Sequence, residues 1–130
     1  MLSIIIPCHN EQGVIASTVE ELLKENEKRQ IDTEFVLVNN NSSDNTLDVL
    51  NEIAAAHNNI KVVSTPPTPG YGVACRWGVY CATGEFVLIT MADASESPNE
   101  VFGRGVSKQC MVRDLRTKFV VAFRGASSGG

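Results

Sequence analysis

Polar residues able to bind a phosphate, a sugar or a metal ion gather in three short segments, each directly after an apolar run. The segments are residues 7–13 (PCHNEQG), 39–46 (NNNSSDNT) and 91–98 (MADASESP). Residues such as Asn10 and Glu11 are typical of a turn and a helix start, so the first segment alone favours a structural interpretation. The second has enough hydrogen-bonding groups to form its own turns and also to recognise a nucleobase and ribose, and its position favours recognition.

The third segment places the carboxylate of Asp93 just beyond an apolar, strand-like run. A lone aspartate there can cap the following turn, which is the structural interpretation. It can also hold a divalent cation, because Mg²⁺ takes only one or two protein carboxylates and completes its shell with phosphate oxygens and water. We therefore expect Asp93 to bind Mg²⁺ or Mn²⁺ when a diphosphate shares the ion, with Glu96 as an auxiliary ligand or, more simply, a solvent-facing side chain.

The elements around these segments alternate between two hydrophobic periods. Short apolar or β-branched runs predict strands, and helical spacing of apolar residues predicts helices between them. The predicted strands cover residues 2–6, 34–38, 60–64 and 85–90. The predicted helices cover residues 13–27, a segment capped by Ser43 or Asp44, and residues 70–82. This order predicts a Rossmann-like, three-layer α/β/α domain with a mostly parallel sheet, ending after the fourth strand. Ligands of such sheets bind at the carboxyl ends of the strands, where all three polar segments fall.

Composition narrows the function classes. The 130 residues are 43% hydrophobic and 20% charged with a net charge of −4, values that fit a globular domain and argue against a nucleic-acid binder. Four cysteines without metal-ligand spacing fit reduced thiols in the cytoplasm. We expect no signal peptide and no transmembrane segment, because the chain begins in a strand and no apolar run approaches a membrane span of about 18 residues.

Charge divides the chain at about residue 100. Residues 1–100 hold 5 basic and 14 acidic side chains, whereas residues 101–130 hold 6 and 1. We expect residues 1–100 to form the ligand-binding unit and 101–130 a basic, partly disordered tail ending in Gly and Ser, with one strand at 118–123. One interpretation is a truncated or frame-altered gene product, and the other is a basic segment that attracts anionic lipid or phosphate.

In this order and spacing, the motifs resemble the family-2 glycosyltransferases over about residues 2–100. IIIPCHNE is similar to the family's first strand and P-x-x-N-E turn, and VNNNSSDNT to its V-D-D-G-S-x-D-x-T segment. PGYGVACRWGVYCATGEFVLITMADASESP is similar to the helix, strand and metal loop of the dolichol-phosphate mannosyltransferase-like branch. A dinucleotide dehydrogenase fits less well because the first turn of this chain lacks the G-x-G-x-x-G motif. A sugar nucleotidyltransferase also fits less well, because that class has a Gly-rich first loop and this chain does not.

The resemblance implies a GT-A fold, a nucleotide-diphosphate sugar as donor, and roles for matching positions. Residues around the nucleoside would be Pro7, His9 and Glu11, those at the base and ribose Val38 and Asn40, and those at the diphosphate Ala92, Asp93 and Ser95. Asp93 would be both the metal ligand and the catalytic residue.

Two departures from the family pattern affect metal and base binding. Met91 stands where many members have the first Asp of a D-x-D pair, and Asn40 replaces a common Asp. The first departure predicts weaker metal affinity, and the second leaves the base preference open.

The implied reaction transfers a sugar to an acceptor. From the resemblance, we expect this acceptor to be a polyprenyl or dolichyl phosphate. Such an acceptor would place the protein at the cytoplasmic face of a membrane. The alternative is a catalytically incomplete fragment that binds a nucleotide sugar without transferring it.

Overall fold

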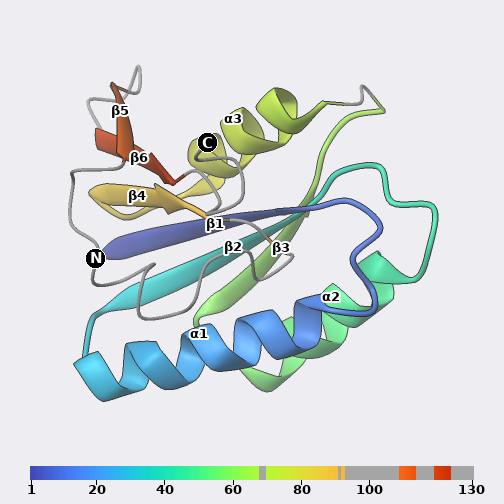
Figure 1. The fold of residues 1–130 in the computed structure, drawn as a ribbon, viewed down its shortest axis with the longest axis horizontal. Coiled ribbons are helices and arrows are strands. Elements are labelled where there is room, and N and C mark those ends of the chain that lie inside the picture. Colours follow the sequence, from blue (N-terminus) through green and yellow to red (C-terminus); the bar gives the residue numbers. More distant parts are fainter. Residues whose placement is uncertain (68–69, 91, 93–108, 114–118, 124–130) are drawn as a thin grey trace.

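The computed structural model describes residues 1–67, 70–90, 92, 109–113 and 119–123. For residues 109–113 and 119–123 it describes the backbone alone. Strands and helices alternate along the first ninety residues, and two further strands follow. In order they are β1 (Leu2–Cys8), α1 (Ile15–Arg29), β2 (Thr33–Asn39), α2 (Thr46–Ala56), β3 (Ile60–Ser64), α3 (Tyr71–Cys81), β4 (Phe86–Ile89), β5 (Gln109–Arg113) and β6 (Phe119–Phe123). Figure 1 shows α1 and α2 on one face of the sheet and α3 on the other.

All nine elements belong to one layered unit built on a six-stranded sheet of order β3-β2-β1-β4-β6-β5. Strands β1 to β4 and β6 pair in parallel, and β5 pairs antiparallel to β6. The chain crosses from β3 at one edge to β4 on the far side of β1, so the topology switches direction between β1 and β4. Crevices at such switch points are the ligand sites of open α/β sheets.

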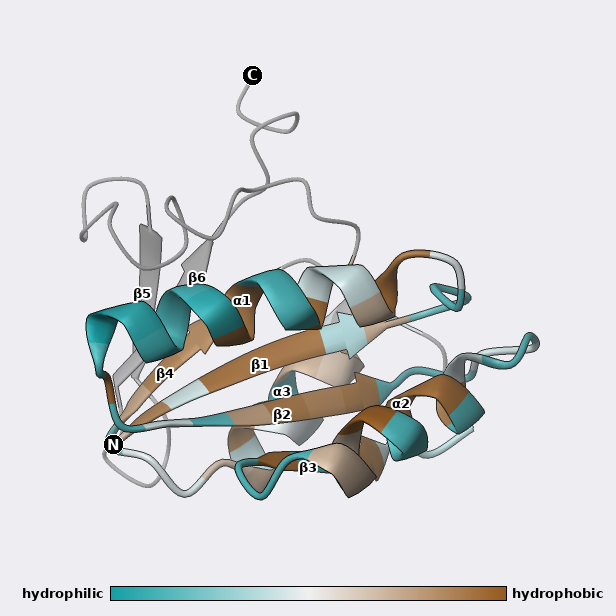
Figure 2. Ribbon diagram, turned by 90° about the horizontal axis from the view of Figure 1, so that it is seen from below, coloured by the Kyte–Doolittle hydropathy of each residue, from teal (hydrophilic) through white to brown (hydrophobic). Residues whose placement is uncertain are grey.

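The core lies on both faces of the central strands. In β1, Ile4 and Ile6 pack toward α1 and α2, whereas Ile5 packs toward α3, and all three side chains are fully buried. This is why the strand reads as a continuous apolar run, unlike a strand with one face in water. Figure 2 shows the hydrophobic central strands beneath the polar outer surface of α1.

Helix α3 packs closely on the sheet because Gly78 faces β1. A Cβ atom at this position would overlap the side chain of Ile5 and lie 3.1 Å from Cγ2 of Val38. The glycine therefore sets the distance between the helix and the sheet. The same packing directs Trp77 and Tyr80 of α3 toward the surface.

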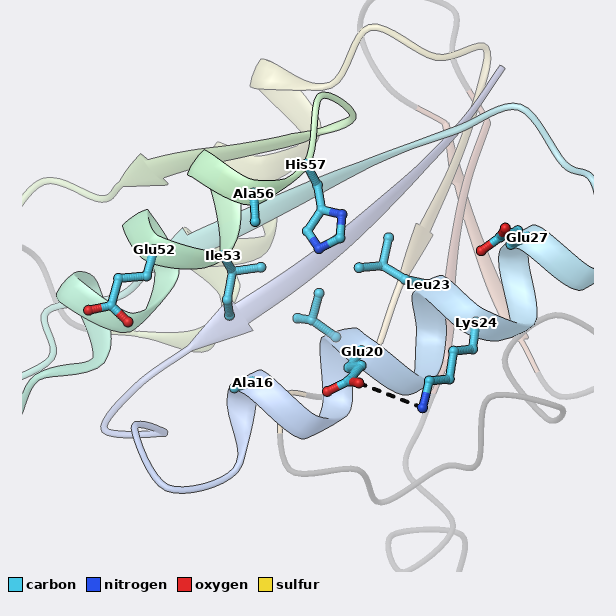
Figure 3. Close-up of a pocket in the computed structure, with 10 residues that line it drawn as sticks. Ala16, Glu20, Leu23, Lys24, Glu27, Glu52, Ile53, Ala56 and His57 are labelled. Carbon is cyan, nitrogen blue, oxygen red and sulfur yellow. Dashed lines mark ion pairs between the residues drawn. The ribbon is translucent and has the colours of Figure 1, made fainter.

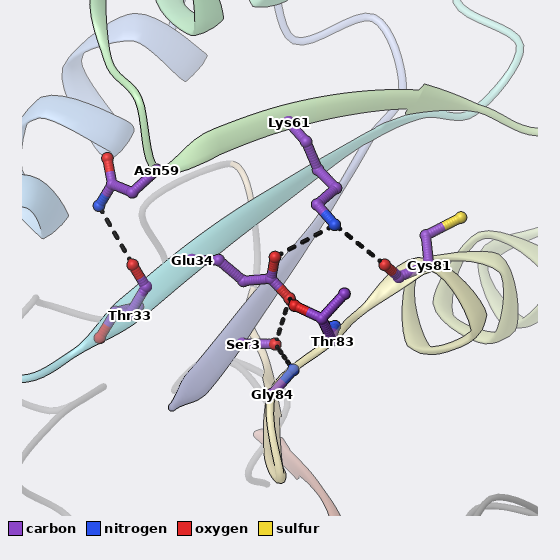
Figure 4. Close-up of polar contacts among 8 residues, drawn as sticks. All are labelled: Ser3, Thr33, Glu34, Asn59, Lys61, Cys81, Thr83 and Gly84. Atoms are coloured by element: carbon purple, nitrogen blue, oxygen red, sulfur yellow. Dashed lines mark hydrogen bonds and ion pairs between the residues drawn. The ribbon is translucent and has the colours of Figure 1, made fainter.

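A buried carboxylate joins the strands at their amino ends, opposite the predicted ligand edge (Figure 4). Glu34 Oε2 accepts hydrogen bonds from Ser3 Oγ at 2.6 Å, Thr83 N at 2.6 Å and Thr83 Oγ1 at 2.9 Å, and Oε1 lies 3.1 Å from Lys61 Nζ. Burial alone would raise the pKa of Glu34, but the hydrogen bonds from Ser3, Thr83 and Lys61 outweigh it and lower the pKa from 4.5 to about 2. This network fixes the turn between α3 and β4.

The structure confirms the predicted α/β fold with a mostly parallel sheet. The sheet nevertheless continues past the fourth strand, where the sequence placed its end, because β6 pairs with β4 and fills its open edge. Strand β6 falls within predicted residues 118–123, whereas β5 was not predicted. Among the described residues, none of the helices has the length and apolar character needed to cross a bilayer.

Candidate functional site at the carboxyl edge of the sheet

The segments after β1 and β2 are joined by hydrogen bonds at the carboxyl edge of the sheet. The centre of this junction is Asn10, whose Oδ1 accepts from Ser43 N at 2.7 Å, Ser43 Oγ at 3.3 Å and Asp44 N at 3.4 Å. In return, the backbone N–H of Asn10 donates to Ser42 Oγ at 3.1 Å. Asn10 has a φ of 53°, a left-handed conformation that asparagine tolerates better than most residues. The structural interpretation of the first segment is therefore correct for Asn10.

The start of α2 strengthens the same junction. Asp44 Oδ1 accepts from the amide of Thr46 at 2.9 Å and from its hydroxyl, and the side-chain bond from Thr46 lowers the pKa of Asp44. The buried hydroxyl of Thr46 also accepts from the amide of Glu11 at 2.8 Å. Asn45 N donates to Gln12 Oε1 at 2.7 Å, which adds another bond between the segments. The side chain of Asp44 thus forms a turn with Thr46, the first residue of α2.

His9 lies exposed at the edge with a fixed ring orientation. Its Nδ1 lies 2.7 Å from the backbone oxygen of Asn40, and a carbonyl only accepts, so Nδ1 carries the hydrogen. The other nitrogen, Nε2, is therefore an acceptor in the neutral ring. This arrangement presents an imidazole edge beside the ends of β1 and β2, and the role of His9 near the nucleoside stays a prediction.

Asn40 is buried between three segments and is held by its side chain. Its Nδ2 donates to Gly70 O at 3.3 Å, and its Oδ1 accepts from Thr65 Oγ1 at 3.3 Å and from Asn41 Nδ2 at 3.4 Å. The segment after β3 and the start of α3 are thereby tied to the same edge. An aspartate at this position would lose the donor that contacts Gly70, which gives the departure from the family pattern a structural counterpart.

The end of β4 reaches the same edge beside β1. Thr90 N donates to Ile5 O at 3.0 Å, and Thr18 Oγ1 of α1 donates to the carbonyl of Ala92 at 3.0 Å. Ala92 is buried against the α1 side of the core. Asp93 and Ser95, the predicted metal and diphosphate residues, lie outside the described residues, as does Glu96. The chain therefore enters their segment from the carboxyl edge.

Two further predicted contacts belong to strands of the core. Pro7 is buried in β1, and Val38 is fully buried in β2, where its side chain packs on the α3 side. Cys8, between Pro7 and His9, donates its thiol to Ile6 O at 3.2 Å. Burial and the nearby charge of Glu11 raise the pKa of Cys8 to about 12, so its thiol stays protonated at neutral pH and has a structural role.

One buried polar atom at this edge has no hydrogen-bond partner within the described part of the chain. It is Oδ1 of Asn39, the last residue of β2, which is 8% exposed. Buried oxygens are normally satisfied, so its presence next to Asn40 marks the strand end as a place where a polar contact is still to be made.

A groove on another surface offers a different location for a ligand. It has a volume of about 430 Å³ and lies between α1 and α2, away from the strand ends (Figure 3). Its lining is mixed, with Leu23 and Ile53 beside the ion pair of Glu20 and Lys24, which are 3.6 Å apart. No group of three metal-ligating side chains occurs here or elsewhere among the described residues. The groove thus lies on the α1 and α2 side, apart from the polar segments that follow the strands.

Sequence reasoning identified the three polar segments but not the residues that hold them together. Thr46 and Gln12 were not singled out, although both join the first two segments, and Asn10 was noted without its partners. Ser and Thr near a helix start are a signal for capping, but no sequence feature pairs residue 10 with residues 42–44. That pairing follows from the parallel register of Cys8 with Asn39.

Solved structures with this arrangement are glycosyltransferases of the GT-A type. TarS of S. aureus (residues 1–349) shares 31% identity with a TM-score of 0.57, and the match covers 71% of this chain and 27% of TarS. TarS has also been solved in complex with UDP and with UDP-GlcNAc.

The family model for glycosyl transferase family 2 matches residues 3–108, and the chain belongs to this family. Probable glycosyltransferase YdaM of Bacillus subtilis is 33% identical over 77% of this chain and 24% of its own length. Dolichyl-phosphate beta-glucosyltransferase ALG5D of Trichomonas vaginalis is 32% identical over 72% and 30%. The match thus spans about a quarter to a third of the length of these two relatives.

Proposed function

We propose that this chain binds a nucleotide-diphosphate sugar at the carboxyl edge of its sheet and serves in glycosyl transfer. The observation that carries the proposal is the convergence of the segments after β1, β2 and β3, joined through Asn10 and Asn40, beside the end of β4. Family membership and the UDP-GlcNAc complex of TarS support it. The edge combines an exposed imidazole, buried amides and helix starts, which are groups that recognise nucleosides and phosphates.

The proposed acceptor is a polyprenyl or dolichyl phosphate, as in the dolichol-phosphate mannosyltransferase-like branch. The dolichyl-phosphate relative supports this class of acceptor. An anionic phosphate oxygen would attack the sugar C1 while the bond from C1 to the diphosphate breaks, and the nucleoside diphosphate would leave. Because that oxygen is already ionised, the reaction needs little help from a general base. The protein would then work peripherally at the cytoplasmic face of a membrane.

Asp93 is proposed to hold Mg²⁺ or Mn²⁺ near the diphosphate, with Ala92 and Ser95 beside it. A bound cation would supply neutralisation of the charge that develops on the leaving diphosphate. The described residue that precedes Asp93 is Ala92, whose carbonyl accepts a hydrogen bond from Thr18. A single carboxylate suffices for such an ion only when phosphate oxygens complete its shell, so metal and nucleotide should bind together.

Calorimetry with UDP-, GDP- and dTDP-sugars, with and without Mn²⁺, tests the proposal. We expect one class of sugar nucleotide to bind, and Mn²⁺ to tighten binding by about tenfold, the order of one carboxylate–cation contact. Asp93→Ala should remove that gain. Glu85→Ala is the matched control, because it deletes an exposed carboxylate before β4 at the opposite edge.

The outcomes separate three cases. Equal binding by Asp93→Ala and wild type in Mn²⁺ would refute the role of Asp93. Binding without transfer to any polyprenyl phosphate would favour the alternative function, a nucleotide-sugar-binding fragment. No binding of any sugar nucleotide would refute the proposal itself.

A further inference from the structure

Helix α3 carries an aromatic and cationic surface on the side away from the sheet. Arg76, Trp77 and Tyr80, which we call the α3 outer face, are all exposed, Trp77 by 39% and Tyr80 by 63%. The two rings stack with centroids 6.3 Å apart and an interplanar angle of 23°. Positions 76 and 80 are one helical turn apart, so the guanidinium and the rings occupy the same stripe of the helix.

The charge of α3 differs from that of the other two helices. Helix α1 contains four carboxylates and three basic side chains, α2 contains two carboxylates, and α3 contains no carboxylate and one basic side chain, Arg76. Arg76 forms no ion pair with any of the described residues. The acidic helices lie on the opposite face of the sheet (Figure 1), about 20 Å away for two packed layers. That separation exceeds the Debye length of about 8 Å at physiological salt. The carboxylates of α1 and α2 therefore repel an anionic surface in contact with α3 only weakly.

We propose that the α3 outer face docks on the headgroup layer of an anionic membrane. Tryptophan and tyrosine combine an apolar ring with a polar tip and concentrate at membrane–water interfaces. An arginine on the same stripe pairs with lipid phosphate in a bidentate way. Of the three described helices, α1 and α2 have net negative charge and α3 has net positive charge, so α3 is the one that an anionic surface would attract. The surface therefore sets an orientation as well as an attachment.

The sole tryptophan of the chain lies in this surface, which provides a direct probe. Full-length protein is mixed with vesicles of phosphatidylcholine alone or with an equal share of phosphatidylserine. We expect a blue shift of Trp77 emission, and co-sedimentation, with the anionic vesicles only. Arg76→Glu should lower the partition coefficient about tenfold, since each basic residue near an anionic surface contributes about 1 kcal/mol and the reversal removes one and adds a repulsion. Tyr80→Ser should lower it about threefold through loss of the ring.

A matched control separates this surface from general attraction. Lys28→Glu makes the same charge change at an exposed position of α1, and partition should stay within about twofold of wild type. Thermal unfolding verifies that each variant folds, and nucleotide binding is measured in the same samples. Loss of nucleotide binding with intact vesicle binding would affect the proposed function alone.

Three results would overturn the docking proposal. The first is an unchanged Trp77 spectrum with anionic vesicles. The second is equal partition of Arg76→Glu and Lys28→Glu. The third is an emission shift that follows protein concentration without lipid, which would assign the surface to a second copy of the chain.

Discussion

Glu34→Gln is expected to lower the free energy of unfolding at pH 7 by about 2 kcal/mol. This is the order of the cost when a buried carboxylate is removed and its hydrogen-bond partners are left unpaired. The side chain is 11% exposed and receives bonds from Ser3, Thr83 and Lys61. Urea titration of both proteins measures the difference. Glu20→Gln is the control, because Glu20 forms an exposed ion pair with Lys24 and its loss should cost about 0.5 kcal/mol or less.

The same network sets a pH dependence. The pKa of Glu34 is about 2 in the folded protein and 4.5 as its ordinary value. A depressed folded pKa stabilises the protein above the ordinary value, and that contribution is lost as the pH falls from about 4.5 to 2. The stability difference between wild type and Glu34→Gln should therefore shrink over this range. A difference that stays constant from pH 7 to pH 2.5 would contradict the assigned ionisation.

Asn10→Gly is expected to weaken nucleotide binding about three- to tenfold, because it removes the acceptor that holds the first two segments together and so adds an ordering cost to binding. Glycine keeps the left-handed backbone at φ 53°, so the change isolates the side chain. Stability should fall by about 1 kcal/mol as the bonds to Ser43 and Asp44 are lost. Calorimetry and urea titration measure the two effects.

Gln30→Gly is the control for Asn10→Gly. Gln30 also has a left-handed φ, 55°, but lies at the far end of α1 and is exposed. Glycine there should be neutral or stabilising by up to about 1 kcal/mol, with nucleotide affinity unchanged. Equal losses of affinity in the two variants would show that the junction at Asn10 has no particular part in binding.

The sequence was sufficient for the elements and for the edge that carries the site. Period and β-branched composition located β1 to β4 within a residue or two, because strands buried on both faces need apolar side chains at every position. The helix starts were predicted to similar accuracy. The second helix was expected to follow a cap at residue 43 or 44, and α2 begins at Thr46, whose amide donates to Asp44 Oδ1.

Contacts between distant residues could not be predicted in the same way. Glu34 looks like an ordinary polar strand end in the sequence, and only the register that pairs it with Ser3 reveals the buried carboxylate. The strand β5 was also missed, although its antiparallel pairing with β6 is local in sequence and begins at Arg113 and Phe119. The role of Asn40 at the base stays a prediction, and the hydrogen bonds of its side chain with Gly70 and Thr65 could not be predicted from the sequence.

The central claim is that a nucleoside diphosphate binds where the segments after β1, β2 and β3 meet beside the end of β4. Amide chemical-shift mapping with Mg²⁺ and UDP or GDP tests it most directly, since each backbone amide reports its own surroundings. We expect the largest shifts at residues 9–12, 40–46 and 90–92, with little change along the groove between α1 and α2. Shifts centred on that groove, or no shifts with either nucleotide, would contradict the claim.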